Sequence, residues 1–236
     1  MSSYPVLVHR LANAFLDLIY PPTCGGCRRA GARFCQRCLA QVQWLDGGPT
    51  CSRCGRPDPD GELCPQCRRS PPELDALRSA AFFTGPLREA VHAFKYTGRT
   101  DLAEPLAGLM ATFWQRAPLP ADVVVPVPLH PARERERGFN QAASLARAFA
   151  AQVGLPLAAG GLVRVRDTPP QVGLNAQERQ ANVRGAFRAG PEPLPGRRLL
   201  IIDDVCTTGA TLEACAAALL AAGCDAVYAL TLARAG

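Results

Sequence analysis

The feature that most constrains this chain is a strongly apolar segment followed by two acids and a hydroxyl-rich turn. Residues 199–202 are all apolar, and Asp203 and Asp204 follow directly. Such a run predicts a strand buried on both faces, as in a parallel sheet between layers of helices. Open sheets of this class bind ligands beyond the carboxyl ends of their strands. We therefore expect a ligand site at residues 203–211.

The turn after the two acids has the composition of an anion site. Residues 207–211 read Thr-Thr-Gly-Ala-Thr and open a helix that we expect over residues 209–222. Backbone N–H groups at a helix N-terminus point outward and favour phosphate, and Gly209 permits a close approach. Adjacent carboxylates need hydrogen-bond donors or a cation, which a sugar diol and Mg²⁺ supply. A capped helix without a ligand is the alternative interpretation.

Eight of the eleven cysteines form four Cys-x-x-Cys pairs, a spacing typical of zinc sites. Two pairs complete a tetrahedral site of four thiolates, so four pairs predict two zinc ions. A site closed by four thiolates has no open position for a reacting water, and we expect both sites to be structural. The predicted ligands are Cys24, Cys27, Cys35, Cys38, Cys51, Cys54, Cys64 and Cys67.

The simplest pairing joins the first motif with the second and the third with the fourth. Crossed pairing fits the spacing as well. Four disulfides, as in a secreted domain, and an iron–sulfur cluster are further alternatives. The regular paired spacing favours zinc, as does the lack of a signal-peptide pattern.

Strand and helix patterns alternate after the cysteine region, which ends at Pro71 and Pro72. This alternation predicts an α/β fold with a mostly parallel sheet and helices on both faces. We place an N-terminal helix in residues 1–20, the zinc module in 21–70 and the second domain in 75–236. Residues 167–184 predict a long polar loop with a short helical piece. The expected strands are 76–83, 122–127, 162–165, 198–202 and 226–233, and the expected helices are 85–96, 101–116, 140–153 and 209–222.

Basic residues gather in the middle of the chain. The net charge is +6, and between Pro126 and Gly190 nine arginines stand against four acids. A local positive field suits a phosphate-rich ligand, although an ordinary solvated surface has the same composition. No stretch reaches the roughly 18 apolar residues of a membrane span. The apolar stripe of residues 6–19 is interrupted by polar residues, so we expect a cytoplasmic protein with no membrane insertion.

The stretch 199–211 resembles the phosphoribosyl-pyrophosphate (PRPP) motif of type I phosphoribosyltransferases. The resemblance implies a type I phosphoribosyltransferase-like fold, with Mg²⁺ carried by the ligand. It implies that Asp203 and Asp204 bind the ribose hydroxyls. It also implies that the threonine turn cradles the 5-phosphate, through Thr207, Thr208, Gly209, Ala210 and Thr211.

Four further segments resemble the competence protein F (ComF) family: the double zinc ribbon from Cys24 to Cys67, residues 92–99 (HAFKYTGR), residues 124–141 and residues 168–187. With the PRPP motif they follow the family's order over nearly the whole chain from about residue 20. The family implies a PRPP-binding fold and, in naturally transformable bacteria, a role in handling incoming DNA. Its expected partners are PRPP and single-stranded DNA or DNA-uptake proteins.

The same resemblance assigns the loop after the strand expected at 122–127. Pro128 lies in a segment positioned like the family's pyrophosphate-binding loop, and Arg133, Arg135 and Arg137 follow it. Arginine side chains suit pyrophosphate oxygens, and we take Pro128 and Arg137 as binding residues. A solvated, self-paired Arg-Glu segment is the alternative interpretation.

Residues 168–184 resemble the mobile loop that closes over PRPP in this superfamily. Arg166 and Arg179 are candidates for contacts to the leaving group. His92 and His130 are expected to be ordinary packed or surface residues without a catalytic role.

Two functions follow from these patterns. The first is transfer of phosphoribose from Mg-PRPP to a nitrogen acceptor, which the sequence does not identify. The second is a non-catalytic protein on the same fold that senses PRPP or binds single-stranded nucleic acid. Zinc ribbons and an arginine-rich surface are compatible with the second function.

Overall fold

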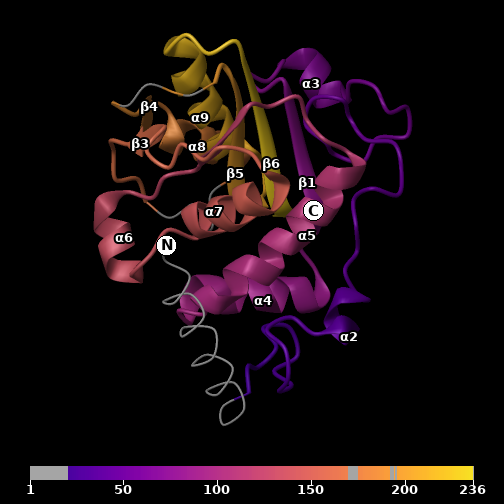
Figure 1. The fold of residues 1–236 in the computed structure, drawn as a ribbon. Helices are drawn as coiled ribbons and strands as arrows, with labels where there is room; N and C mark the ends of the chain where they lie inside the picture. The colour runs from indigo at the N-terminus through magenta and orange to yellow at the C-terminus, as the bar shows by residue number, and fades with distance from the viewer. Residues whose placement is uncertain (1–20, 170–174, 192–193, 195, 236) are drawn as a thin grey trace.

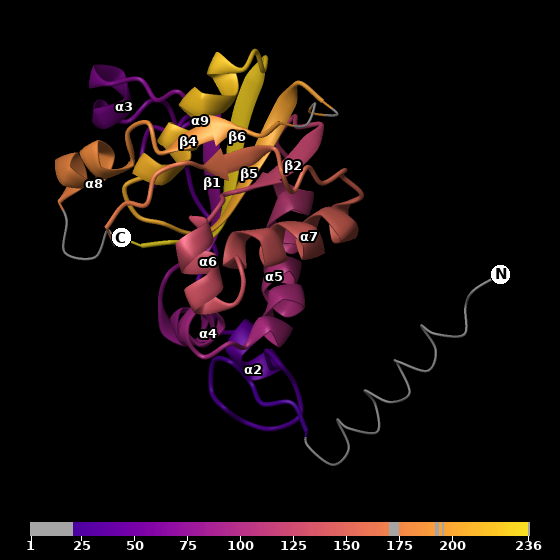
Figure 2. The ribbon, with the colours of Figure 1, turned by 90° about the vertical axis from the view of Figure 1, so that its left-hand side faces the viewer.

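The computed structural model of the chain describes residues 21–169, 175–191, 194 and 196–235. Its centre is a four-stranded parallel sheet in the order β1-β6-β5-β2 (Figures 1 and 2). The expected N-terminal helix in residues 1–20 lies outside the described residues. The strands are β1 (Ala76–Phe82), β2 (Val123–Pro126), β5 (Arg198–Cys206) and β6 (Ala226–Arg234).

Helices cover both faces of this sheet, as the alternating pattern predicts. Leu200 and Ile202 of β5 point into one core, and Leu199 and Ile201 point into the other, because neighbouring strand residues alternate between faces. The first core is covered by α4 (Gly85–Tyr96), α5 (Ala103–Arg116) and α7 (Gln141–Val153). The second core is covered by α9 (Ala210–Ala221).

The strand expected at 162–165 forms, but it does not join the parallel sheet. It forms β3 (Leu162–Arg164), which pairs antiparallel with β4 (Phe187–Ala189) in a separate two-stranded sheet. This small sheet lies beside α9 and frames the polar segment that contains α8 (Ala176–Val183). The segment between β3 and β4 is therefore anchored at both of its ends.

Helix α6 (Pro131–Arg137) has no counterpart among the expected helices. His130 is its N-cap, with Nδ1 accepting the N–H of Ala132, and Gly138 ends it in the left-handed conformation with φ 84°. None of its residues is buried, so the caps and Pro131 at the first helical position account for it better than packing does.

The zinc module covers the outer edge of β1. The backbone of residues 43–45 pairs antiparallel with β1 around Ala81, and Leu77 N donates to the Arg53 carbonyl at 2.6 Å. An uncovered edge strand invites pairing with other chains. The module therefore also closes the sheet on this side.

The two halves of the zinc module lie at opposite ends of the molecule, as both views show (Figures 1 and 2). The half with α2 (Gln36–Leu39) lies near α4, where Gly25 approaches Ala90 and Leu102. The half with α3 (Pro65–Arg69) lies near the start of β1. None of the helices in the described ranges has the length and apolar character that crossing a bilayer requires.

Candidate functional site

The turn between β5 and α9 has the geometry of a phosphate site. Gly209 caps α9 with φ 87°, in the left-handed region that favours glycine. The turn encloses a small pocket of about 50 Å³, a volume suited to a group of a few atoms. Its walls are formed by Asp203, Val205, Cys206, Thr207, Gly209, Ala210, Thr211 and Leu212.

Most of the residues predicted for this site thus share one pocket, and two do not line it. Thr208 is exposed, and its Oγ1 accepts the N–H of Ala210 at 3.4 Å, which helps to start α9. Asp204 is buried beside the pocket without lining it. The pocket therefore combines one carboxylate, from Asp203, with the backbone and hydroxyls of the turn.

Asp203 and Asp204 contact different parts of the molecule, because successive strand side chains point to opposite faces. Asp204 Oδ1 lies 2.8 Å from Nζ of Lys95, which belongs to α4 on the first face. Asp203 lines the pocket beside α9 on the second face, and its Oδ1 accepts the N–H of Asp204 at 2.8 Å. Asp203 is thus the acid nearest to the phosphate turn.

The electrostatic surroundings of the two acids differ accordingly. Burial and the neighbouring Asp204 raise the pKa of Asp203, Lys95 opposes both, and the resulting pKa is about 7. Burial lowers the pKa of Lys95, but the charges of Asp204 and Asp203 outweigh this effect and raise it. Lys95 therefore stays charged at neutral pH, whereas Asp203 is close to its midpoint and responds to any donor or cation placed in the pocket.

Lys95 is the residue of this site that the sequence reasoning did not assign. It stands in the segment HAFKYTGR, far from the acids in the chain, and no local pattern links the two. One feature of the sequence does distinguish Lys95, because it is the only lysine among the 26 lysine and arginine residues. A chain that uses arginine everywhere else and lysine once has a position where the compact ammonium is tolerated or preferred.

The loop after β2 approaches the same edge of the sheet. Pro126 pairs with Ile202, the residue before Asp203, so Pro128 follows β2 at the level of the acids. The buried Asn140 donates from Nδ2 to the Val127 carbonyl at 3.1 Å and joins the start and the end of the loop. The structure thus places the predicted pyrophosphate loop next to the acid pair.

The three arginines of α6 have different surroundings. Arg133 donates to the Thr168 carbonyl at 2.8 Å, so it holds the start of the segment between β3 and β4. Arg137 lies over the ring of Tyr96, with 5.6 Å between guanidinium carbon and ring centroid. Arg135 is exposed. Arg137 is therefore the α6 arginine that is held beside α4, the helix that carries Lys95.

The segment between β3 and β4 reaches the phosphate turn through one arginine. Arg179 of α8 donates to Oγ1 of Thr207 at 2.8 Å. Arg166 instead donates to the carbonyls of Asn182 at 3.0 Å and Arg184 at 2.5 Å. The structure thus brings Arg179 to the rim of the pocket, whereas the hydrogen bonds of Arg166 hold the segment itself.

The cysteines form two clusters with sequential pairing, which confirms the simplest arrangement. In each cluster all sulfur atoms lie within 4.8 Å of one another. The Sγ atoms of Cys24 and Cys38 are 3.6 Å apart, and those of Cys54 and Cys64 are 3.8 Å apart. A tetrahedron with Zn–S bonds of about 2.3 Å has edges of about 3.8 Å, so both clusters fit a zinc ion. All eleven cysteines lie in described residues, and all are free of disulfides.

Backbone N–H groups stabilise thiolates in both clusters. Cys35 N lies 3.3 Å from Cys24 Sγ, and Cys64 N lies 3.4 Å from Cys51 Sγ. Burial raises the pKa of Cys24 and Cys51, but N–H donors outweigh burial and lower each pKa to about 6. Zinc binds the thiolate form, so this arrangement suits a structural metal site.

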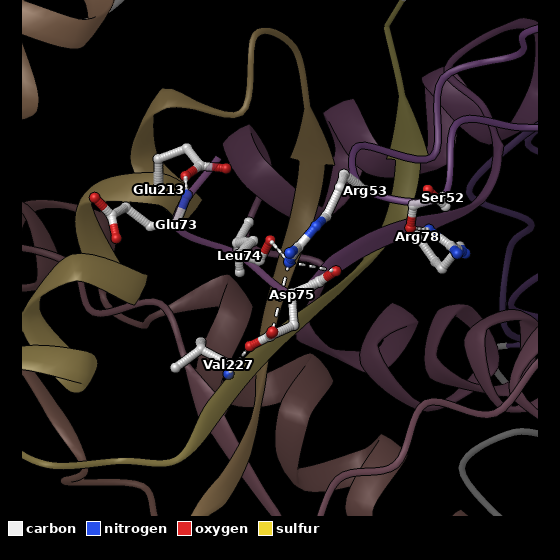
Figure 3. A network of polar contacts seen from close by, with 8 residues as sticks. All are labelled: Ser52, Arg53, Glu73, Leu74, Asp75, Arg78, Glu213 and Val227. Carbon is white, nitrogen blue, oxygen red and sulfur yellow. Dashed lines mark hydrogen bonds and ion pairs between the residues drawn. The ribbon is translucent and has the colours of Figure 1, made fainter. Parts of the chain in front are cut away.

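A polar network ties the second cluster to the parallel sheet (Figure 3). Arg53, between Cys51 and Cys54 in sequence, donates to the carbonyls of Leu74 and Asp75 at 3.1 Å each. The Asp75 carboxylate in turn accepts the N–H of Val227 in β6 at 3.0 Å. One arginine therefore connects a zinc knuckle to the starts of two strands.

The same region reaches the helix that carries the phosphate turn. Glu213, in the first turn of α9, accepts the N–H of Glu73 at 2.7 Å (Figure 3). A Cβ added at Gly209 would lie 3.8 Å from Leu77 of β1, the strand whose backbone bonds to Arg53. Strand β1 therefore lies between the second half of the zinc module and the phosphate turn.

Comparison with known proteins finds matches to two domain families, one in each part of the chain. Residues 15–68 match the double zinc ribbon domain, and residues 136–236 match the phosphoribosyl transferase domain. DNA utilization protein YhgH of Salmonella typhi is 37% identical over 191 residues, which cover 78% of this chain and 83% of that protein. Competence protein F of Haemophilus influenzae is 29% identical over 210 residues, which cover 85% and 90%. This chain belongs to the competence protein F family.

Further similar proteins include competence protein ComFC of Bacillus subtilis, which is 29% identical over 209 residues covering 81% of this chain and 79% of that protein. Among solved structures, the glutamine PRPP amidotransferase of B. subtilis has a TM-score of 0.42 and 22% identity, covering 60% of this chain and 30% of that one. Adenine phosphoribosyltransferase of Leishmania donovani has a TM-score of 0.35 and 17% identity, covering 59% and 55%. From the two domain matches and the cysteine clusters, this competence protein F family member combines a zinc-ribbon module with a phosphoribosyltransferase-like domain.

Proposed function

We propose that this chain binds Mg-PRPP at the β5–α9 turn and transfers its phosphoribosyl group to a nitrogen acceptor. The observation that carries the proposal is the pocket that joins the Asp203 carboxylate to the turn of residues 207–211. The 5-phosphate accepts hydrogen bonds from the N–H groups at the start of α9. The ribose hydroxyls donate to Asp203, the acid that lines the pocket, while Asp204 pairs with Lys95 on the other face.

The edge of the sheet also suits the rest of the ligand. Mg²⁺ prefers oxygen ligands, and Asp203 in its ionised form offers carboxylate oxygens at the pocket. Bound with the pyrophosphate, Mg²⁺ neutralises part of the charge that develops on the leaving group. The loop at Pro128 and the guanidinium of Arg137 hold the pyrophosphate end in our proposal.

The chemistry asked of the chain is positioning and electrostatic stabilisation. The bond between ribose C1 and pyrophosphate breaks, a bond from C1 to the acceptor nitrogen forms, and the acceptor loses a proton. No covalent bond to the protein is needed. The chain contributes by fixing the ribose between acids and phosphate turn, and by placing positive charge beside the leaving group.

The names of the relatives support a role in DNA uptake or use, and we extend that role to this chain in the cytoplasm. We also propose two units: a double zinc ribbon at residues 21–70 and a phosphoribosyltransferase-like domain at residues 75–236. The network from Arg53 to Asp75 supports close docking of the two units.

A row of rings on the surface of α4 favours single-stranded nucleic acid as a second ligand. His92 stacks on Phe83 with centroids 5.8 Å apart and lies 5.8 Å from the ring of Tyr96, which is 66% exposed. Arg137 lies over the ring of Tyr96. Exposed rings flanked by arginine are typical of surfaces on which bases stack.

Pyrophosphate release from Mg-PRPP by the purified chain tests the enzyme proposal. The acceptors to compare are a panel of nitrogen bases and single-stranded DNA. We expect release that depends on an acceptor and is lost in Asp203→Asn. Binding of PRPP without release with any acceptor would favour the non-catalytic function. For the second ligand, Tyr96→Ala should weaken binding of single-stranded DNA while Mg-PRPP binding is kept.

A further inference from the structure

We propose that Arg179 is the residue that brings positive charge to the 5-phosphate, so that α8 covers the phosphate end of the ligand. This inference rests on the proposed function, because it assigns one end of PRPP to one residue. It differs from the sequence-based expectation, which assigns Arg179 to the leaving pyrophosphate. The structure favours the phosphate end because Arg179 donates to Oγ1 of Thr207, in the turn itself.

The position of Arg179 follows from how α8 is built. The helix begins with a capping box, in which Asn175 accepts the N–H of Glu178 at 3.0 Å and donates its own N–H to the Glu178 carboxylate at 2.7 Å. Val183 near its end is 1% exposed and packs in the core that contains Leu212 of α9. Residues four apart share one face of a helix, so anchoring Val183 directs Arg179 toward α9 as well.

The last turn of α8 is held to the β3 side of the segment, which supports the placement of Arg179. Asn182 donates from Nδ2 to the Pro169 carbonyl at 3.0 Å, and Arg166 donates to the carbonyls of Asn182 and Arg184. These bonds fix the last turn of the helix against the strand β3 side of the segment. The arginine at the rim is therefore presented by a fixed helix.

The charge balance of the phosphate turn gives the second argument. Residues 207–211 are two threonines, a glycine, an alanine and a threonine, all uncharged. A phosphate monoester carries nearly two negative charges at neutral pH. Any full positive charge at this turn must come from another element, and α8 supplies Arg179 there.

The acids, by contrast, already have a cation of their own. Lys95 pairs with Asp204 at 2.8 Å, on the face opposite to the pocket. The two cations thus contact different groups at the end of β5. Lys95 forms an ion pair with Asp204, and Arg179 donates to Thr207 in the turn. A 5-phosphate bound at the turn would lie beside the Arg179 guanidinium that donates to Thr207.

Calorimetric titration of the full chain with three ligands tests the inference: Mg-PRPP, ribose 5-phosphate and Mg-pyrophosphate. Arg179→Gln removes the charge and keeps a polar side chain of helical propensity. We expect it to weaken ribose 5-phosphate and Mg-PRPP by about 10- to 100-fold, the usual range for a charge-assisted hydrogen bond. Mg-pyrophosphate should bind Arg179→Gln as it binds the wild type. Arg179→Lys should recover part of the loss.

Arg184→Gln is the matched control, because it removes the same charge from the exposed end of the same segment. We expect it to bind all three ligands within about twofold of the wild type. Equal losses in Arg184→Gln and Arg179→Gln would show a general effect of net charge and overturn the inference. A loss confined to Mg-pyrophosphate and Mg-PRPP would return Arg179 to the leaving group and also overturn it. A wild type that binds none of the three ligands would overturn the proposed function itself.

Discussion

Lys95 Nζ lies 2.8 Å from Asp204 Oδ1 and joins the last turn of α4 to the end of β5. The Lys95 side chain is 22% exposed and that of Asp204 is 9% exposed. Solvent and salt screen such a pair much less than a surface pair. This contact fixes the acid next to Asp203 and links the pocket to the helix layer on the other face of the sheet.

The first prediction is that this ion pair contributes to folding. Lys95→Met should lower the free energy of unfolding by about 1–3 kcal/mol, because it leaves the Asp204 carboxylate buried without its cation. In a double-mutant cycle with Asp204→Asn, the two losses should add to more than the loss in the double variant, with a coupling above about 1 kcal/mol. Urea unfolding measures all four proteins. Strictly additive losses would contradict the pair's role, and Lys95→Arg should keep most of the stability.

The second prediction concerns pH. The pKa of Asp203 is raised to about 7, mainly by burial, so Asp203 is mostly protonated below this pH. Binding of Mg-PRPP at low pH must therefore displace a proton from Asp203. Ribose hydroxyls and a cation favour the ionised form, so the affinity should rise between about pH 6 and pH 8. The free energy of unfolding without ligand should show the opposite trend. A folded state with a raised acid pKa binds more protons than the unfolded state, so this group's contribution falls between about pH 4 and 7.

Asp203→Asn serves as the control for both pH dependences, because it removes the titrating group and keeps the shape. Calorimetry and urea unfolding over the pH series give the two curves. A pH dependence of affinity that persists unchanged in Asp203→Asn would assign it to another group.

The third prediction is two zinc ions per chain. Elemental analysis of the purified protein should give two, one for each cluster of four cysteines. Cys24→Ser should reduce the content to one, because three thiolates hold zinc less tightly than four. Cys224→Ser is the control, since Cys224 belongs to neither cluster. A single ion in the wild type would contradict one of the two sites.

The fourth prediction tests the docking of the second zinc ribbon. Gly55 has φ 63°, and a Cβ there would collide with the carbonyl oxygen of Leu77 in β1. Gly55→Ala should therefore destabilise the protein by about 2 kcal/mol or more. Gly47→Ala is the control, because a Cβ at that position meets nothing within 4 Å. Thermal unfolding that is equal in the two variants would show that the ribbon is not docked at Leu77.

Local chemistry explains which elements the sequence predicts well. The four apolar residues of β5, the two acids and the glycine before α9 lie next to one another in the chain, and so their roles follow from neighbours. The zinc clusters are equally local, because each Cys-x-x-Cys pair sets its own geometry. These elements have the bounds and partners that the patterns predict, within a few residues.

Contacts between distant segments are what the sequence does not predict. Leu162 of β3 pairs with Ala189 of β4; the sequence predicts β3 as a strand, but it predicts neither β4 nor this pairing. Helix α6 has no apolar face, because its ends rather than its packing stabilise it, so periodicity does not reveal it. Lys95 and Asp204 meet only because α4 and β5 lie side by side in the folded chain.

The pocket itself combines both kinds of information. Its turn is local and predictable, whereas the approach of Arg179 depends on the packing of α8 against α9. The separation of Asp203 from Asp204 is a consequence of strand alternation through the end of β5. The sequence pattern predicts that the strand ends at residue 202. The two acids would then follow it in a turn and could share one site, whereas in the structure both belong to β5.

Calorimetric titration of Mg-PRPP into four proteins tests the central claim most directly. The wild type should bind, and Asp203→Ala should bind more weakly by about 1–3 kcal/mol, since it loses hydrogen bonds to a charged group. Gly209→Val should abolish binding, because its φ of 87° disfavours a side chain and Gly209 lines the pocket. Thr208→Val, from the same turn but outside the pocket lining, should bind nearly as the wild type does. No binding by the wild type at millimolar ligand, or equal binding by wild type and Asp203→Ala, would contradict the assignment of this site.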